Sequence, residues 1–93
     1  MSQTKTLYIL IKGSVQGVGF RFFLRQKAQQ LGITGYARNL SNGNLEVIAQ
    51  SKSEESLNNF IEQCKRGPLL AKIESVDVRT IQTQQNYDFF DIR

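Results

Sequence analysis

A glycine-rich segment followed by an arginine is the part of this sequence best suited to chemistry. Three of the seven glycines lie between Gly13 and Gly19, and Arg21 follows them. A glycine-rich turn before a helix directs several backbone N–H groups at one anion, and the helix N-terminus adds partial positive charge. Arg21 adds a planar set of donors. Residues Ser14 to Phe20 with Arg21 are therefore a candidate phosphate or carboxylate site; the alternative is a plain tight turn and a surface arginine.

Two other features of the sequence bear on this candidate site. No Gly-Lys-Ser/Thr follows Gly17, and Phe22 occupies the place of the third glycine in a dinucleotide fingerprint, so neither common nucleotide-binding loop is present. Asn39 lies in a segment of β-type composition although asparagine is a poor strand former. Its amide is a candidate for function, and a cross-strand or turn hydrogen bond is the alternative.

The composition excludes several classes of catalyst. The 93 residues contain no His and one Cys, which excludes His-containing triads and dyads, a disulfide and most transition-metal sites. We expect one domain over residues 1–93, with Cys64 as a free thiol in the core. Phe22 lies off the apolar stripe of its helix; we expect it at the edge of the core, and the alternative is the mouth of the candidate site. The net charge of +4 fits an anionic partner or simply solubility. The apolar run 7–11 is too short for a membrane span, so we expect a cytoplasmic protein.

The hydrophobic pattern predicts five strands and two helices. Strands are expected at residues 7–11, 36–40, 45–49, 73–79 and 89–92, with a hairpin turn at Asn42-Gly43 and an irregularity near Ser75. Helices are expected at 20–31 and, capped by Ser51 or Ser53, up to Gly67. This order is typical of the α+β class, as a two-layer ferredoxin-like sandwich (βαββαβ) with two helices on one face of an antiparallel four- to five-stranded sheet.

Two segments resemble the signatures of the acylphosphatase family. Residues 11–21, IKGSVQGVGFR, are similar to its first signature residue for residue. The second signature is matched by GYARN at 35–39 with Gly43, Glu46 and Val47, and the family also has similar residues at Gly67-Pro68, Ala71 and 90–92. Leu45 and Ser51 depart from the usual Val and Gly. The resemblance covers nearly the whole chain.

This resemblance implies a small hydrolase that splits acyl phosphates into a carboxylate and inorganic phosphate without a metal ion or cofactor. Substrates of the class include 1,3-bisphosphoglycerate and carbamoyl phosphate. Asn39 would orient the attacking water. The phosphoryl oxygens would be held by Arg21 and by the loop of Ser14, Val15, Gln16, Gly17, Val18, Gly19 and Phe20.

The residue inventory suits this reaction. A carboxylate leaving group, with a conjugate-acid pKa of about 4 to 5, needs no general acid, so the absence of His is no handicap. No nucleophile with an activating base is visible, which predicts direct attack by water. We expect a monomer with a small-molecule substrate and no nucleic-acid or membrane partner. The alternatives are a carbamoyl-phosphate-binding or channelling domain and, less favoured by motif placement, an RNA-binding ferredoxin-like module.

Overall fold

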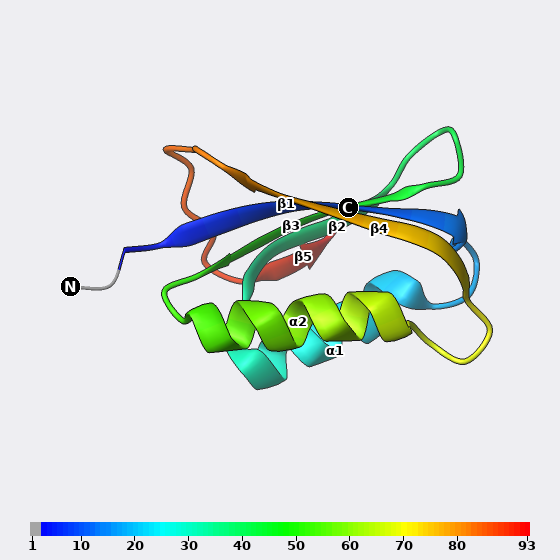
Figure 1. Ribbon diagram of the computed structural model, residues 1–93, viewed down its shortest axis with the longest axis horizontal. Helices are drawn as coiled ribbons and strands as arrows, with labels where there is room; N and C mark the ends of the chain where they lie inside the picture. Colours follow the sequence, from blue (N-terminus) through cyan, green and yellow to red (C-terminus); the bar gives the residue numbers. More distant parts are fainter. Residues whose placement is uncertain (1–2) are drawn as a thin grey trace.

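Two helices cover one face of a five-stranded sheet in the computed structural model, which describes residues 3–93 (Figure 1). The sheet order is β4-β1-β3-β2-β5. This is the predicted α+β two-layer architecture. The elements are β1 (Lys5–Ser14), α1 (Phe20–Leu31), β2 (Thr34–Asn39), β3 (Leu45–Ser51), α2 (Glu54–Arg66), β4 (Lys72–Ile81) and β5 (Phe90–Ile92).

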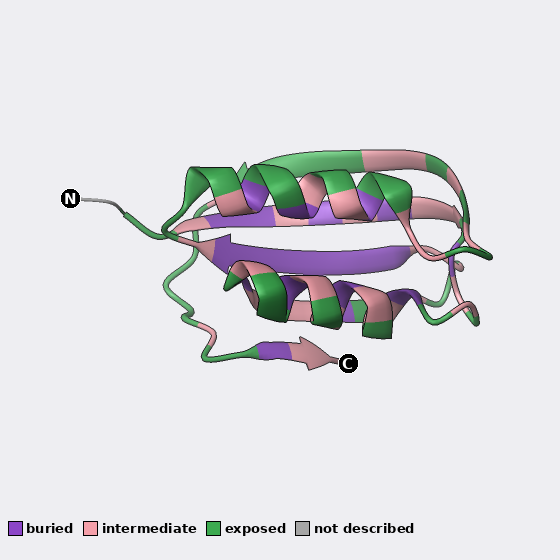
Figure 2. Cartoon of the chain, turned by 90° about the horizontal axis from the view of Figure 1, so that it is seen from below, coloured by how far each residue is buried: buried purple, intermediate pink, exposed green. Residues whose placement is uncertain are grey.

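The core lies between the sheet and the two helices. β3 is buried along nearly its whole length, and the inner faces of both helices are buried against the sheet (Figure 2). Helix α1 contributes Phe20, Leu24 and Ala28, which recur at four-residue spacing and so share one face. Helix α2 contributes Cys64, which is fully buried, as predicted from its place on the apolar stripe.

One edge of the sheet differs from the expected antiparallel arrangement. β5 pairs parallel with β2, with Gly35 opposite Phe90 and Ala37 opposite Ile92, so the sheet is mixed. The reason is the path of the chain: β4 forms one edge, and the segment after it crosses to the opposite edge before β5 begins. Gln50 holds this crossing segment, since its Nε2 donates to the carbonyl of Gln85 and its Oε1 accepts from the backbone N–H of Tyr87.

The strand that leads into the glycine loop is held close to its neighbour. The register of β1 and β4 shifts between Lys12 and Gly13, which confirms the irregularity predicted near Ser75. Gly13 has φ +135°, and a Cβ at this position would collide with the carbonyl oxygen of Lys72. Only glycine permits this close approach of β1 to β4, and the approach fixes the position at which the following loop begins.

The ends of the helices follow their local sequence. Helix α1 begins after Gly19, which has φ +76° and offers no side-chain cap, and ends before Gly32. Helix α2 begins after Ser53, whose Oγ accepts from the N–H of Ser56, so Ser53 rather than Ser51 is the cap. In residues 3–93 no helix is long and apolar enough to cross a bilayer.

Candidate active site

A small cavity lies where the loop after β1, the first turn of α1 and the end of β2 meet. Its volume is about 110 Å³, and no acidic residue in the described part of the chain lines it. In Figure 1 the β1–α1 loop lies at the same end of the molecule as the β2–β3 hairpin and the α2–β4 turn. The lining residues are Val15, Gly17, Gly19, Phe20, Arg21, Phe22 and Asn39.

The loop backbone leaves a row of hydrogen-bond donors free. Within the described chain, no backbone N–H from residue 15 to residue 22 donates a hydrogen bond. Gly17 and Gly19 have φ +75° and +76°, and a Cβ at either would meet open space, so glycine is needed for conformation rather than for room. The free donors and the N-terminus of α1 together make the loop receptive to an anion.

Arg21 adds a positive charge to the same cavity. Its Nη1 donates to the backbone oxygen of Arg93 at 3.0 Å, and among the described residues it forms no ion pair. Arg93 is itself held by its N–H, which donates to the carbonyl of Ala37 at 2.9 Å. The chain after β5 therefore holds one edge of the guanidinium, while its remaining donors stay available.

Asn39 brings a free amide to the cavity. It is the last residue of β2, is half-buried and pairs with Leu45 of β3. The cross-strand or turn hydrogen bond considered for its side chain is not made to any residue between 3 and 93. The amide can therefore hold a small polar molecule beside Arg21.

Three members of the predicted loop set do not line the cavity. Ser14 is exposed at the end of β1, and Val18 packs partly against the core. The side chain of Gln16 points to the hairpin, where its Nε2 donates to the carbonyl oxygens of Leu40 and Asn44 at 2.7 and 3.0 Å. Sequence reasoning missed this link between the loop and the hairpin, because nothing local to Gln16 indicates an acceptor more than twenty residues away.

Of the two places considered for Phe22, the preferred one at the edge of the core is wrong, and the alternative at the mouth of the site is what the structure shows. Phe22 is 60% exposed and is one of the residues that line the cavity. The reason is helical geometry: Phe22 follows the buried Phe20 by two residues, which is about 200° around the helix axis. Its place off the apolar stripe was the signal for exposure.

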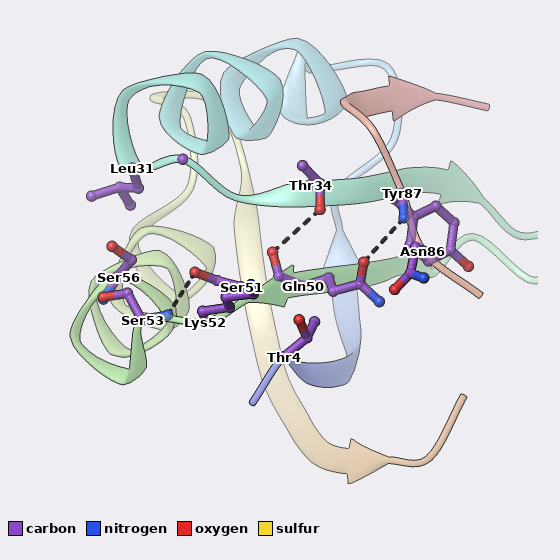
Figure 3. A pocket seen from close by; sticks show the side chains of 11 residues that line it. Thr4, Leu31, Thr34, Gln50, Ser51, Lys52, Ser53, Ser56, Asn86 and Tyr87 are labelled. Carbon is purple, nitrogen blue, oxygen red and sulfur yellow. Dashed lines mark hydrogen bonds between the residues drawn. The ribbon is translucent and has the colours of Figure 1, made fainter. Parts of the chain in front are cut away.

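A larger hollow of about 480 Å³ lies at the other end of the sheet, beside the start of α2 (Figure 3). The groups drawn there largely bond one another: Gln50 accepts from Tyr87 and Thr34, and Ser51 accepts from Ser53. Of residues 3–93, Lys52 is the one charged residue that lines it. The smaller cavity, in contrast, brings together the glycine loop, Arg21 and Asn39.

The fold and the smaller cavity define a ferredoxin-like α+β domain with an anion-receptive loop between its first strand and first helix. The model of the acylphosphatase family matches residues 7–92. The chain therefore belongs to the acylphosphatase family, enzymes that hydrolyse acyl phosphates.

Individual relatives agree with this assignment. An acylphosphatase from Caldivirga maquilingensis is 42% identical over 85 residues, which cover 91% of this chain and 90% of the relative. The solved acylphosphatase structure from Coxiella burnetii has a TM-score of 0.90 at 32% identity and covers 97% of this chain and 93% of its own. A crystal structure of full-length HypF in the phosphate- and nucleotide-bound form has a TM-score of 0.88 at 34% identity, covering 98% of this chain but 12% of HypF.

Proposed function

We propose that this chain hydrolyses acyl phosphates by direct attack of water on a phosphoryl group held by the loop 14–20 and Arg21. One observation carries the proposal: the unpartnered loop N–H groups, the guanidinium of Arg21 and the free amide of Asn39 surround the same cavity. Phosphoryl transfer through a loose transition state asks a protein mainly for such positioning and positive charge.

In the proposed reaction, Arg21 and the loop N–H groups bind the phosphoryl oxygens. The side chain of Asn39 orients a water molecule, whose oxygen forms a bond to phosphorus while the bond between phosphorus and the acyl oxygen breaks. The carboxylate leaves without a proton, and the proton of the water passes to the phosphate product. Holding the water in line replaces a bimolecular encounter, which contributes up to about 7 to 11 kcal/mol in well-oriented systems.

The proposal also covers the setting of the reaction. We infer one domain acting as a monomer in the cytoplasm on a small acyl phosphate, with no cofactor, nucleic-acid or membrane partner. Across residues 3–93 no three or more His, Cys, Asp or Glu side chains gather closely enough to hold a metal ion. The comparison with and without EDTA described below tests whether the reaction proceeds without a metal ion.

The test is hydrolysis of acetyl phosphate by wild type and Arg21→Ala, with and without EDTA. Wild type is expected to release phosphate at the same rate with and without the chelator, and Arg21→Ala is expected to lose about 100- to 1,000-fold in kcat/KM. Activity that disappears with EDTA, or that survives in Arg21→Ala, would overturn the mechanism.

The match to one part of HypF favours a second candidate, a domain that binds or channels carbamoyl phosphate within a larger enzyme. Carbamoyl phosphate binding by the isolated chain without turnover of any acyl phosphate would favour this candidate. The RNA-binding alternative has no such support, because Phe20 is buried and Phe23 is half-buried on α1 rather than exposed on the sheet.

A further inference from the structure

Phe22 is an exposed aromatic ring at the mouth of the candidate active site. The other large apolar residues that line this cavity, Val15 and Phe20, are 1% and 2% exposed, whereas Phe22 is 60% exposed. Val15 and Phe20 therefore belong to the core, and Phe22 is the large apolar surface that the cavity offers to a ligand. A single exposed Phe is common on protein surfaces and needs no functional explanation. Phe22, however, lines the same cavity as Arg21 and Asn39.

The ring is supported by a cation from the next turn of the helix. The guanidinium carbon of Arg25 lies 5.1 Å from the ring centroid of Phe22, a distance suited to a cation–π contact. Among residues 3–93, Arg25 forms no ion pair that would draw it away. Arg25 thus favours one orientation of the ring, and it adds positive charge at a mouth that anionic substrates must pass.

The chemistry of an acyl phosphate then decides what the ring contacts. With the phosphoryl group bound by the loop N–H groups and Arg21, the acyl group is the part of the substrate left to project from the small cavity. We propose, resting on the function proposed above, that Phe22 is the acyl-group contact of this enzyme and selects aromatic acyl phosphates over small aliphatic ones. Stacked or edge-to-face aromatic pairs supply attraction that an acetyl group cannot obtain.

The test compares benzoyl phosphate with acetyl phosphate in wild type, Phe22→Ala, Phe22→Tyr and Phe89→Ala. Phe89 is a matched control, because it is 66% exposed but does not line this cavity. In Phe22→Ala the ratio of kcat/KM for benzoyl phosphate to that for acetyl phosphate is expected to fall about 3- to 10-fold, mostly through KM. Phe22→Tyr and Phe89→Ala are expected to keep the wild-type ratio.

Different results separate this inference from the proposed function. An unchanged ratio in Phe22→Ala, with both substrates still hydrolysed, overturns the role of Phe22 and leaves the enzyme assignment intact. An equal fall in Phe89→Ala also overturns it, because the effect would then not depend on the cavity. A wild-type chain that hydrolyses neither substrate refutes the proposed function, and the inference with it.

Discussion

Arg21 is suited to a phosphoryl group by the shape of its guanidinium as much as by its charge. We predict that Arg21→Lys loses nearly as much kcat/KM as Arg21→Ala, because an ammonium group cannot bond two oxygens in one plane. Steady-state hydrolysis of acetyl phosphate measures both variants. Near wild-type activity in Arg21→Lys would mean that the site needs a point charge only.

Asn39 is expected to affect the reaction rather than phosphate binding. We predict that Asn39→Ala lowers kcat about 100-fold or more, since the water loses its fixed position. The inhibition constant of inorganic phosphate should stay close to that of wild type in this variant and rise in Arg21→Ala. Equal weakening of phosphate binding in both variants would contradict this division of roles.

Single residues show why part of the site was predictable. The loop glycines and Arg21 are adjacent in the chain, so their types and spacing predict an anion site directly. Gln16 was assigned to the loop through its backbone, whereas its side chain serves the hairpin, a contact that exists only in the folded molecule. For Phe22 the sequence leaves two places open, because its size favours the core whereas its helical phase points outward, and the phase decides.

At the scale of elements, Gln16 connects the loop to the hairpin that ends β2. We predict that Gln16→Ala lowers the free energy of unfolding by about 0.5 to 1.5 kcal/mol, because the carbonyls of Leu40 and Asn44 each lose one of two donors and keep a backbone N–H partner. Urea denaturation measures this change. We also expect kcat to fall, because the hydrogen bonds of Gln16 connect the loop to the hairpin that follows Asn39. Gln26→Ala on the exposed face of α1 is the control and should leave stability within about 0.5 kcal/mol of wild type.

The elements themselves were largely predictable, and their pairing was less so. Alternating or continuous apolar residues indicated all five strands, and Gly32 and Gly67 marked the ends of the helices. The parallel pairing of β5 with β2 was missed because a three-residue strand carries no signal of its partner. That pairing depends on the crossing segment and on Gln50, which is distant from it in sequence.

At the scale of the molecule, the uncovered sheet face carries a hydrogen-bonded group around Glu46. Tyr8 Oη and Tyr36 Oη donate to its carboxylate, and Arg38 Nη2 lies 2.7 Å from Glu46 Oε1. Burial, and then the hydrogen bond to Glu46, raise the pKa of Tyr8 above its usual value of 10.0. Burial and the negative charge of Glu46 raise the pKa of Tyr36 in the same way.

These shifts predict a loss of stability in alkali. The folded protein holds the two tyrosine protons to a higher pH than the unfolded chain does. The stabilisation that these protons give is therefore fully present below the tyrosine pKa of the unfolded chain. It is lost as the pH rises through the higher pKa of the folded protein. Between about pH 9 and pH 11 the free energy of unfolding should fall less steeply in Tyr8→Phe than in wild type. Equal slopes in urea denaturation at several pH values would show that Tyr8 does not contribute.

The core predicts an unreactive cysteine. Cys64 is fully buried, and this burial raises the pKa of its thiol. A thiol reagent such as DTNB should not react with the native protein at pH 8, and labelling should appear together with unfolding in urea. Rapid labelling without denaturant would indicate local opening of α2 at this position.

The place of β1 between β4 and β3 has a consequence for how quickly the enzyme becomes active. Ile9 pairs on one side with Val47 and on the other with Val78, so both neighbours of this strand come from much later in the chain. Contacts of such high sequence separation must close long loops before they stabilise anything, which slows folding relative to a helical bundle. Because the loop of the candidate site begins where β1 ends, a nascent molecule can form both helices before this site exists.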